Sequence, residues 1–509
     1  MSIYIDHQVH GGSHAQFPPD LPHMSLTCAR RQLDLSSSVV LLLAIFALYG
    51  CTSVPEQRPT PLSFEVPAAW SITPAPTLDG ISSLVKWWQR FDDPLLDTLV
   101  SRAMENNTNV NIAQASLRQA WALRDVAAAA LWPSLGVSAS AQHGTSGGKS
   151  MGNTFQVGLN TNWVPDIFAS NRNALNAADA TAQSSAASLS DVQVAIAAEV
   201  GLSYITLRSA QTRLAIAGQN LTSQEETLQI TQWRQQAGLV TELEAEQARA
   251  LAEQTRATLP TLQTAIEQTR HALAALTGQP PAALRELLAA TKPIPQAAAD
   301  LTLNIPAEAL RQRADVRAAE LKVTAALARV AQAEAVRLPS FALGGSLSLN
   351  ALTLGTLTNG ASVMSSVIAS MAAPIFDGGA LRAQVRSQQA AFDQARLAYE
   401  AAVLVALKDV EDALIALQGD RQRLLSLRNA ADAAATASLL ARQRYSSGLV
   451  DFQVVLETQR TQLNTQDGVA SADAEVSADQ VRLYKALGGG WAPVAASIPD
   501  AMATRNLRP

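Results

Sequence analysis

The sequence is poor in the residues that organise small secreted domains and many enzyme active sites. Of its 509 residues only two are cysteine, six are histidine and 5% are aromatic, so disulfide bonds do not organise the fold. Four of the histidines come before Met24 and the other two are far apart, which gives no zinc-binding spacing. The net charge of −5 gives no support for a nucleic-acid partner. No Walker motif, catalytic triad or metal cluster is present, which argues against an enzyme and against a resident cofactor.

Long hydrophobic runs are also lacking. The one apolar run near the N-terminus, Val39–Leu48, rises roughly 15 Å as a helix and is too short to span a bilayer. It follows Arg30 and Arg31, as in a secretory signal, and a start at Met24 would give that signal an ordinary length. The residues Leu48-Tyr49-Gly50-Cys51 resemble a bacterial lipobox, in which the cysteine sulfur receives a diacylglycerol and cleavage leaves that cysteine first.

We therefore interpret residues 1–50 as an N-terminal extension and lipoprotein signal peptide. We also expect Cys51 to carry a covalent lipid that contains palmitate. Thr52 follows, so no aspartate marks the chain for inner-membrane retention and the outer membrane is the implied destination. The alternative is an ordinary signal peptide in which the cysteine occurs by chance.

The mature chain contains two similar halves. An alanine-rich stretch that ends in Pro133-Ser134 recurs about 210 residues later as one that ends in Pro339-Ser340. A Gly-Leu-Val tripeptide that begins at Gly238 recurs in the same way at Gly448. The order in each half is a helix, two short strands and then very long helices. We expect four segments: a linker and equatorial segment at 51–105, a first repeat at 106–295, a second repeat at 296–487 and a tail at 488–509.

Four runs of about ten residues alternate between apolar and small or polar side chains, which predicts strands. The runs cover residues about 134–143, 153–164, 340–350 and 361–374. The fourth is looser, with a polar set of Ser362, Ser366 and Ser370. Ten residues are enough for a tilted strand to cross a bilayer, although a soluble sheet packed on one side explains the alternation equally well. Because four strands cannot close a barrel in lipid, membrane strands would require several chains to share one barrel.

The helical stretches show coiled-coil spacing. Leucines recur every seven residues from Leu207 to Leu228, and valines and leucines follow a three-four spacing from Val403 to Leu424. About 60 residues of continuous helix reach roughly 90 Å. Gly238 and Gly448 lie where each long helix would reverse direction. The alternative interpretation is a solvated two-helix coiled coil that acts as a rod.

Several motifs together carry a resemblance to a known family. They are Trp88–Val100, Arg313–Glu320, Pro374–Gly379, and Arg442–Gly448 with Glu457–Arg460. On these motifs, residues 87–491 resemble the outer membrane efflux protein family, the TolC-like outer membrane factors, and within it the lipoprotein branch that serves resistance-nodulation-division pumps. The family's glutamate and glycine are absent between Trp163 and Ala169, so the geometry of that turn stays open.

The resemblance implies a mainly α fold with a small β part. The protomer is a duplicated helix–strand–strand–helix unit, and a homotrimer forms a twelve-stranded transmembrane β-barrel continued by a long periplasmic α-helical barrel. Segments at about 61–105 and 280–310, with the C-terminal tail, would form a belt around the tunnel. The implied function is the outer-membrane channel of a tripartite efflux pump, a passive exit duct for small toxic compounds or drugs. A periplasmic adaptor and an inner-membrane pump are the implied partners.

The resemblance also places a gate at the hairpin of the second repeat. The acidic residue that lines the family's narrow aperture falls on Glu457, and three such carboxylates on one axis would attract cations. Tyr445, Asp451 and Arg460 are candidates for polar links that hold the helices closed, and a constriction position falls on Gln453. The predicted adaptor contacts are Gly238, Leu239, Gly448 and Leu449.

Two other functions remain open. The same fold could serve as the outer-membrane duct of a type I protein secretion system, with another inner-membrane engine. From a different class, the chain could be a periplasmic coiled-coil scaffold lipoprotein with a soluble sheet.

Overall fold

A computed structural model describes residues 63–71, 84–144, 152–297, 310, 312–357 and 363–491 of the chain. The predicted signal peptide, Met24, Cys51 and the tail after Trp491 lie outside the described residues. Among the residues that the structure does describe, no helix is both long enough and apolar enough to cross a bilayer.

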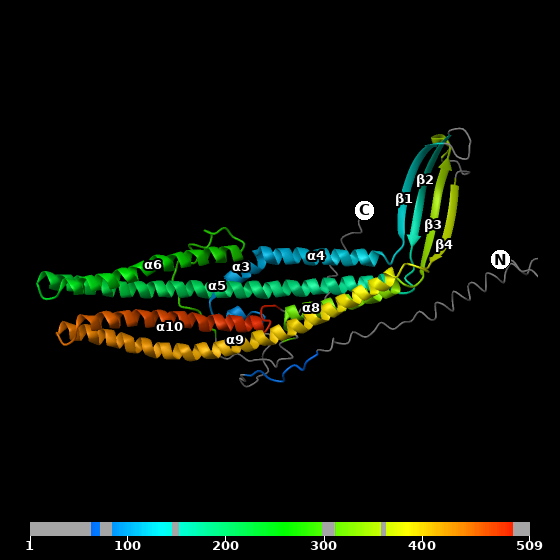
Figure 1. The fold of residues 1–509 in the computed structure, drawn as a ribbon. Coiled ribbons are helices and arrows are strands. Elements are labelled where there is room, and N and C mark those ends of the chain that lie inside the picture. Colours follow the sequence, from blue (N-terminus) through cyan, green and yellow to red (C-terminus); the bar gives the residue numbers. More distant parts are fainter. Residues whose placement is uncertain are drawn as a thin grey trace, which may run out of the picture. The chain divides into compact units, whose positions relative to one another are not determined.

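The two halves of the chain repeat the same order of elements (Figure 1). The first half contains η1 (Trp87–Phe91), α3 (Pro94–Asn106), α4 (Thr108–Ala129), β1 (Ser134–Gly144), β2 (Gly152–Trp163), α5 (Ser170–Gln236) and α6 (Glu242–Leu276). The second half contains α8 (Ala314–Ala335), β3 (Ser340–Ala351), η2 (Leu354–Thr356), β4 (Val363–Ala372), α9 (Ala380–Ser446) and α10 (Phe452–Ala486).

The duplication is visible in the lengths of the helices. Helices α4 and α8 both have 22 residues, α5 and α9 both have 67, and α6 and α10 both have 35. A 67-residue helix is roughly 100 Å long. Such lengths require lateral packing along the whole helix, because propensity alone does not hold so long a helix in water. The heptad residues supply it, since Leu207, Val403 and Val410 are all buried.

The four strands form one antiparallel sheet in the order β1-β2-β3-β4. The register aligns the apolar sets of neighbouring strands, with Val137 opposite Leu159 and Leu159 opposite Leu347, so one face of the sheet is largely apolar. The other face carries small and polar side chains, among them Ser346 and Ser366, whose hydroxyls lie 2.9 Å apart. Strands β1 and β4 each have a neighbour on one side only. The sheet of a single chain therefore ends in two unpaired edges.

The predicted polar set of the fourth strand is interrupted. Met364 and Ile368 alternate with Ser366 and Ser370 on the same face of β4, and they pair with Ser348 and Gly344 of β3. Both side chains are 61% exposed. The expectation of a uniformly polar face therefore holds better for β1 to β3 than for β4.

The turn that departs from the family pattern keeps a left-handed residue. Ala169, which precedes α5, has φ of 60°, and its counterpart before α9 is Gly379 with φ of 89°. The left-handed conformation costs an alanine roughly 1 kcal/mol. Asp166 compensates, because its carboxylate accepts backbone N–H bonds at 3.0 and 2.7 Å in the first turn of α5.

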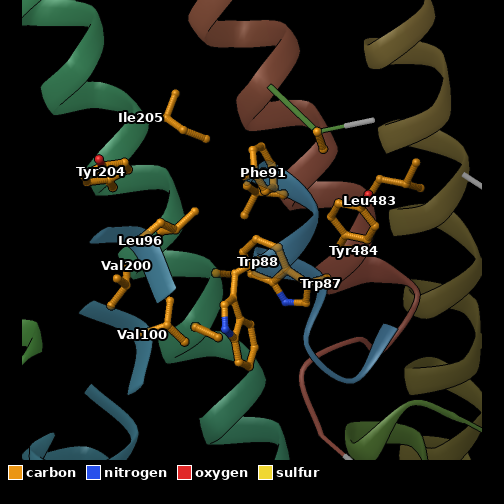
Figure 2. Packing of buried hydrophobic residues seen from close by; sticks show 14 of the residues in the cluster. Trp87, Trp88, Phe91, Leu96, Val100, Val200, Tyr204, Ile205, Leu483 and Tyr484 are labelled. Atoms are coloured by element: carbon orange, nitrogen blue, oxygen red, sulfur yellow. The ribbon is translucent and has the colours of Figure 1, made fainter. Parts of the chain in front are cut away.

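An aromatic cluster joins the N-terminal segment to the long helices (Figure 2). The ring of Trp87 stacks on Tyr484 of α10, with centroids 5.5 Å apart and planes 13° apart, and Phe91 packs edge-on against both rings. Helix α5 passes this cluster at Gly201, where a Cβ would lie 2.9 Å from the Trp87 ring. The segment around Trp87 and Phe91 thus belongs to the hydrophobic core formed with α5 and α10.

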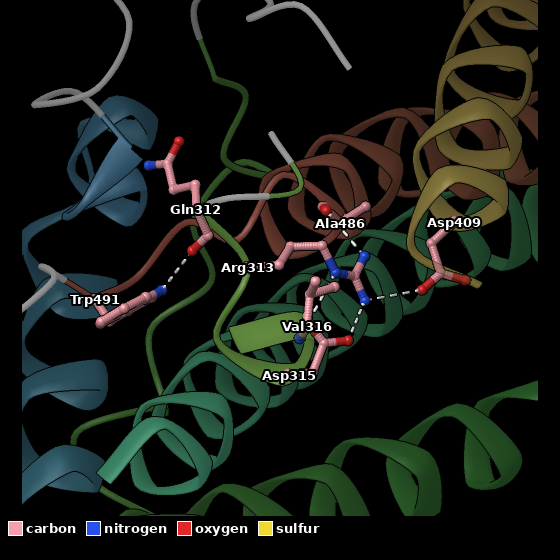
Figure 3. Close-up of polar contacts among 7 residues, drawn as sticks. All are labelled: Gln312, Arg313, Asp315, Val316, Asp409, Ala486 and Trp491. Atoms are coloured by element: carbon pink, nitrogen blue, oxygen red, sulfur yellow. Dashed lines mark hydrogen bonds and ion pairs between the residues drawn. The ribbon is translucent and has the colours of Figure 1, made fainter. Parts of the chain in front are cut away.

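The start of the second repeat is fixed by Arg313 (Figure 3). Its guanidinium lies 2.7 Å from a carboxylate oxygen of Asp315 and 3.3 Å from one of Asp409, and it donates to the carbonyl of Ala486 at 3.0 Å. Burial disfavours the charged form of Asp315, but the hydrogen bonds and charge of Arg313 outweigh it and hold the pKa of that carboxyl below its usual value. The buried arginine therefore connects α8, α9 and the end of α10.

Candidate functional site

Each half of the chain ends in a helical hairpin with the same reversal. Gly238 follows α5 with φ of 69° and Gly448 follows α9 with φ of 74°. The next N–H in each case, from Leu239 or Leu449, bonds back to a carbonyl of the last helical turn at 2.8 and 2.9 Å, as in a Schellman motif. Leu239 and Leu449 are 73% and 74% exposed. Each tip therefore presents an apolar side chain to its surroundings, at the positions predicted for adaptor contacts.

Four of the five predicted gate residues lie at the start of α10, from its N-cap residue Asp451 to Arg460, and the fifth, Tyr445, lies in the last turn of α9. Glu457 and Arg460 are neighbours on the helix surface, with Nη1 of Arg460 3.4 Å from a carboxylate oxygen of Glu457, and both side chains are more than half exposed. Asp451 is the N-cap residue of α10, and its side chain makes no capping bond. Gln453, in the first turn, is also exposed. These side chains form an exposed polar surface near the tip of the second hairpin.

Tyr445 is separate from these four residues, and its ring contacts one aromatic and one cationic side chain. Its ring packs against Phe452, with centroids 5.2 Å apart, and the guanidinium of Arg234 lies 4.9 Å from the ring centroid. The hydroxyl is buried and has no hydrogen-bond partner among the described residues. Because Arg234 comes from the first hairpin, this cation–π contact links the two hairpins of one chain.

A seam of polar side chains between α5 and α10 continues that link away from the tip. Arg213 and Asp467 form a two-point ion pair at 2.6 and 3.0 Å. Hydrogen bonds of 2.8 to 2.9 Å join two further pairs. The three pairs of the seam are Arg213–Asp467, Asn220–Gln466 and Thr227–Gln459. The side chains of Arg213 and Asp467 are 37% and 36% exposed, whereas Asn220 and Gln459 are buried, so water reaches one end of the seam only.

Sequence reasoning missed this seam, although a signal was present. Arg213, Asn220 and Thr227 are seven residues apart, and each precedes a leucine of the heptad by one position. The spacing of the leucines predicts the apolar stripe of α5, but it gives no indication of the polar stripe beside it. On α10 the same spacing separates Gln459 and Gln466.

A second missed group is the buried network around Arg208 of α5. Its guanidinium donates to the carbonyl of Ala290 at 2.6 Å, to the side chain of Gln211 at 2.7 Å and to the hydroxyl of Tyr204 at 2.9 Å. Tyr204 donates in turn to Asp93 at 2.6 Å, and burial, followed by the bond to Asp93, raises the pKa of the tyrosine well above its ordinary value. The network ties the segment that follows α6 to the long helices. Among the described residues, no group of three or more His, Cys, Asp or Glu side chains could hold a metal ion.

The sequence profile of the outer membrane efflux protein family matches residues 99–279 and 305–489, which together span most of both halves. Nodulation protein T of Rhizobium leguminosarum bv. trifolii is 30% identical over 455 residues, which cover 88% of this chain and 96% of that protein. The pyoverdine export outer membrane protein OpmQ of Pseudomonas putida is 31% identical over 478 residues, covering 90% and 98%.

Solved structures agree with this assignment. The outer-membrane channel OprN is 34% identical, superposes with a TM-score of 0.80 and covers 87% of this chain and 100% of that one. The MtrE outer membrane channel of Neisseria gonorrhoeae, in its open state, is 25% identical with a TM-score of 0.77, covering 87% and 99%. The chain belongs to the outer membrane efflux protein family.

Proposed function

We propose that this chain is the outer-membrane channel of a tripartite efflux pump, a passive gated exit duct for small toxic compounds or drugs. The observation that carries the proposal is the joining of two roughly 100 Å helices, in a duplicated arrangement, to a sheet with one apolar face and two open edges. In such a chain the strands can lie in the membrane, and the long helices can extend the wall of the channel beyond it. Relatives that are export proteins and channels by name support the same function.

The open edges support a homotrimer in the outer membrane. Unpaired backbone groups at β1 and β4 are not tolerated in lipid, so β4 of one chain must pair with β1 of the next until the sheet closes. Three chains supply twelve strands, within the range of known barrels. The apolar face of the sheet would meet lipid, and the polar face would line the lumen. A lipid on Cys51 would add an anchor to the same membrane.

The hairpins would meet the partners. We propose that Gly238 with Leu239, and Gly448 with Leu449, contact a periplasmic adaptor, whose inner-membrane pump of the resistance-nodulation-division class supplies the energy. The exposed leucines offer apolar contact area at the tips. Engagement there would act on the polar seam between the hairpins and on the Arg234–Tyr445 contact.

The size of the assembly tests this function directly. Light scattering of the detergent-solubilised protein should give the mass of a trimer. In membranes, protein whose lipid has been removed should stay bound in high salt and require detergent for its extraction. It should also form discrete conducting channels in planar bilayers. A strict monomer that high salt releases would be a periplasmic scaffold, and the channel proposal would be rejected.

Removal of the carboxylate at Glu457 tests the gate. Glu457→Ala is expected to raise single-channel conductance severalfold and to weaken block by divalent cations, because three neighbouring carboxylates on the axis would be lost. Glu457→Gln separates charge from size, and Glu226→Ala on α5 is a matched control for loss of an exposed acid. Unchanged conductance and block in both Glu457 variants would remove this residue from the gate.

A further inference from the structure

A pocket of about 470 Å³ lies where the four helices that adjoin the sheet come together. Helix α4 packs on α5, α5 on α8 and α8 on α9, so α4 and α9 are the two ends of this row (Figure 1). Leu123 of α4 and Gln388 of α9 nevertheless line the same pocket. The row therefore curves around the pocket, which lies on its concave side.

The concave side of this row faces the tunnel in the trimer proposed above, and the inference rests on that proposal. A closed ring of such rows has its axis on the concave side. The pocket is then a recess in the tunnel wall close to the sheet. Its volume is in the range of sites that hold small organic molecules.

The lining of the pocket is apolar with one cationic group. Alanines and leucines from the four helices form most of it, and three glutamines from α8 and α9 also line it. The one charged residue of the lining is Arg329 of α8. Ala120, Leu123, Ala177, Ala333, Val336 and Leu381 are among the residues of its apolar part.

Arg329 has no acidic partner among the described residues. Its single hydrogen bond goes to the hydroxyl of Thr181 at 3.3 Å, the long end of the range. Asp179, two residues before Thr181 on α5, is paired with Arg124 of α4 at 3.5 Å. Arg329 is exposed, and a guanidinium that borders an apolar recess without an acidic neighbour suits a carboxylate, sulfate or phosphate group on an apolar body.

The duplication strengthens this point. Helices α4 and α8 are equivalent and equally long, and Arg329 stands at the same distance from the start of α8 as Leu123 from the start of α4. Both side chains line the pocket. Equivalent positions of the two repeats therefore place a leucine at one side of the pocket and a cation at the other. This arrangement matches a ligand with an apolar body and an acidic end.

We infer that this pocket binds amphiphilic organic anions on their way through the tunnel. The apolar body lies against the alanines and Leu123, and the acidic group accepts hydrogen bonds from Arg329. The pocket is a binding site in the tunnel wall, and it raises the local concentration of such solutes close to the β-barrel.

Equilibrium dialysis of 2-naphthalenesulfonate against the trimer in nanodiscs, read by naphthalene fluorescence and corrected with empty nanodiscs, tests the inference. Wild-type protein should bind the anion, and Arg329→Gln should weaken binding about tenfold, the effect of one charge-assisted contact at a partly exposed site. Arg329→Lys should retain much of the affinity. The uncharged 2-naphthylmethanol should bind both proteins equally, and Leu123→Ala should weaken both probes.

Arg317→Gln is the matched control, because it removes an exposed arginine from the same helix outside the pocket. No anion binding by the wild type, or an equal loss in the Arg317 and Arg329 variants, would overturn the inference. The same holds if Arg329→Gln lowers the yield of trimer and leaves binding unchanged, since the arginine would then be a contact between chains. Export of an uncharged solvent by Arg329→Gln cells reports separately on the channel function, which the variant should preserve.

Discussion

Replacing Arg208 with alanine is expected to lower the free energy of unfolding by about 3–5 kcal/mol, as for other losses of a buried side chain that holds a hydrogen-bond network. The arginine is fully buried and donates to three acceptors, including the carbonyl of Ala290. Its loss leaves a cavity and an unsatisfied carbonyl, and it frees the segment after α6. Denaturant unfolding of the solubilised protein measures the change, and limited proteolysis should show new cleavage near Ala290.

The exposed Arg118 of α4 provides the control for this prediction. Arg118→Ala should change the unfolding free energy by less than about 0.5 kcal/mol, as expected for an unpaired surface position. Arg208→Lys should recover only part of the loss, because one ammonium group cannot reach three acceptors that surround a planar guanidinium. Equal stability of Arg208→Ala and wild type would show that the network is dispensable.

Gly278→Ala is expected to destabilise the protein by more than about 3 kcal/mol, through combined backbone strain and overpacking. Gly278 follows α6 with φ of 69°, and a Cβ there would lie 2.4 Å from the carbonyl oxygen of Asn106. This contact is with backbone, and the neighbouring Asn107 already anchors the end of α6 through a 2.9 Å bond to the carbonyl of Leu276. Neither side can move without separating α6 from the junction of α3 and α4.

Gly238 gives a closely matched comparison for stability. It has the same φ of 69°, but a Cβ added there would meet nothing within 4 Å. Gly238→Ala should therefore show the strain alone, about 1 kcal/mol. Thermal unfolding of the two variants separates strain from collision, and similar losses in both would show that the collision at Asn106 is relieved by small shifts.

The elements of this fold were predictable because their signals are local. Alternation in the runs around Val137 and Leu347 is a property of neighbours in sequence, and so are the heptad leucines of α5. The contacts of the candidate site are not local. Tyr445 meets Arg234 from the other half of the chain, and Arg208 meets a backbone carbonyl, which leaves no mark in the sequence.

Residue type misleads at other positions. Ala169 has a left-handed conformation, which alanine disfavours. The turn before α5 therefore lacks the glycine that would have predicted it from the sequence. Met364 and Ile368 break the polar face of β4, where the serines alone indicated a uniformly polar set. The gate roles of Glu457 and Arg460 stay predictions, because they depend on how three chains meet at an axis.

The two open edges of the sheet have a consequence for the order of assembly. A lone chain cannot leave β1 and β4 unpaired in hydrocarbon, so association must come no later than insertion. Insertion is then a reaction of several molecules, and its rate should rise steeply with the number of chains at the membrane surface. A lipid tether would confine the chains to two dimensions and shorten the search for partners. The anchor would thus matter most during biogenesis and least in the finished duct.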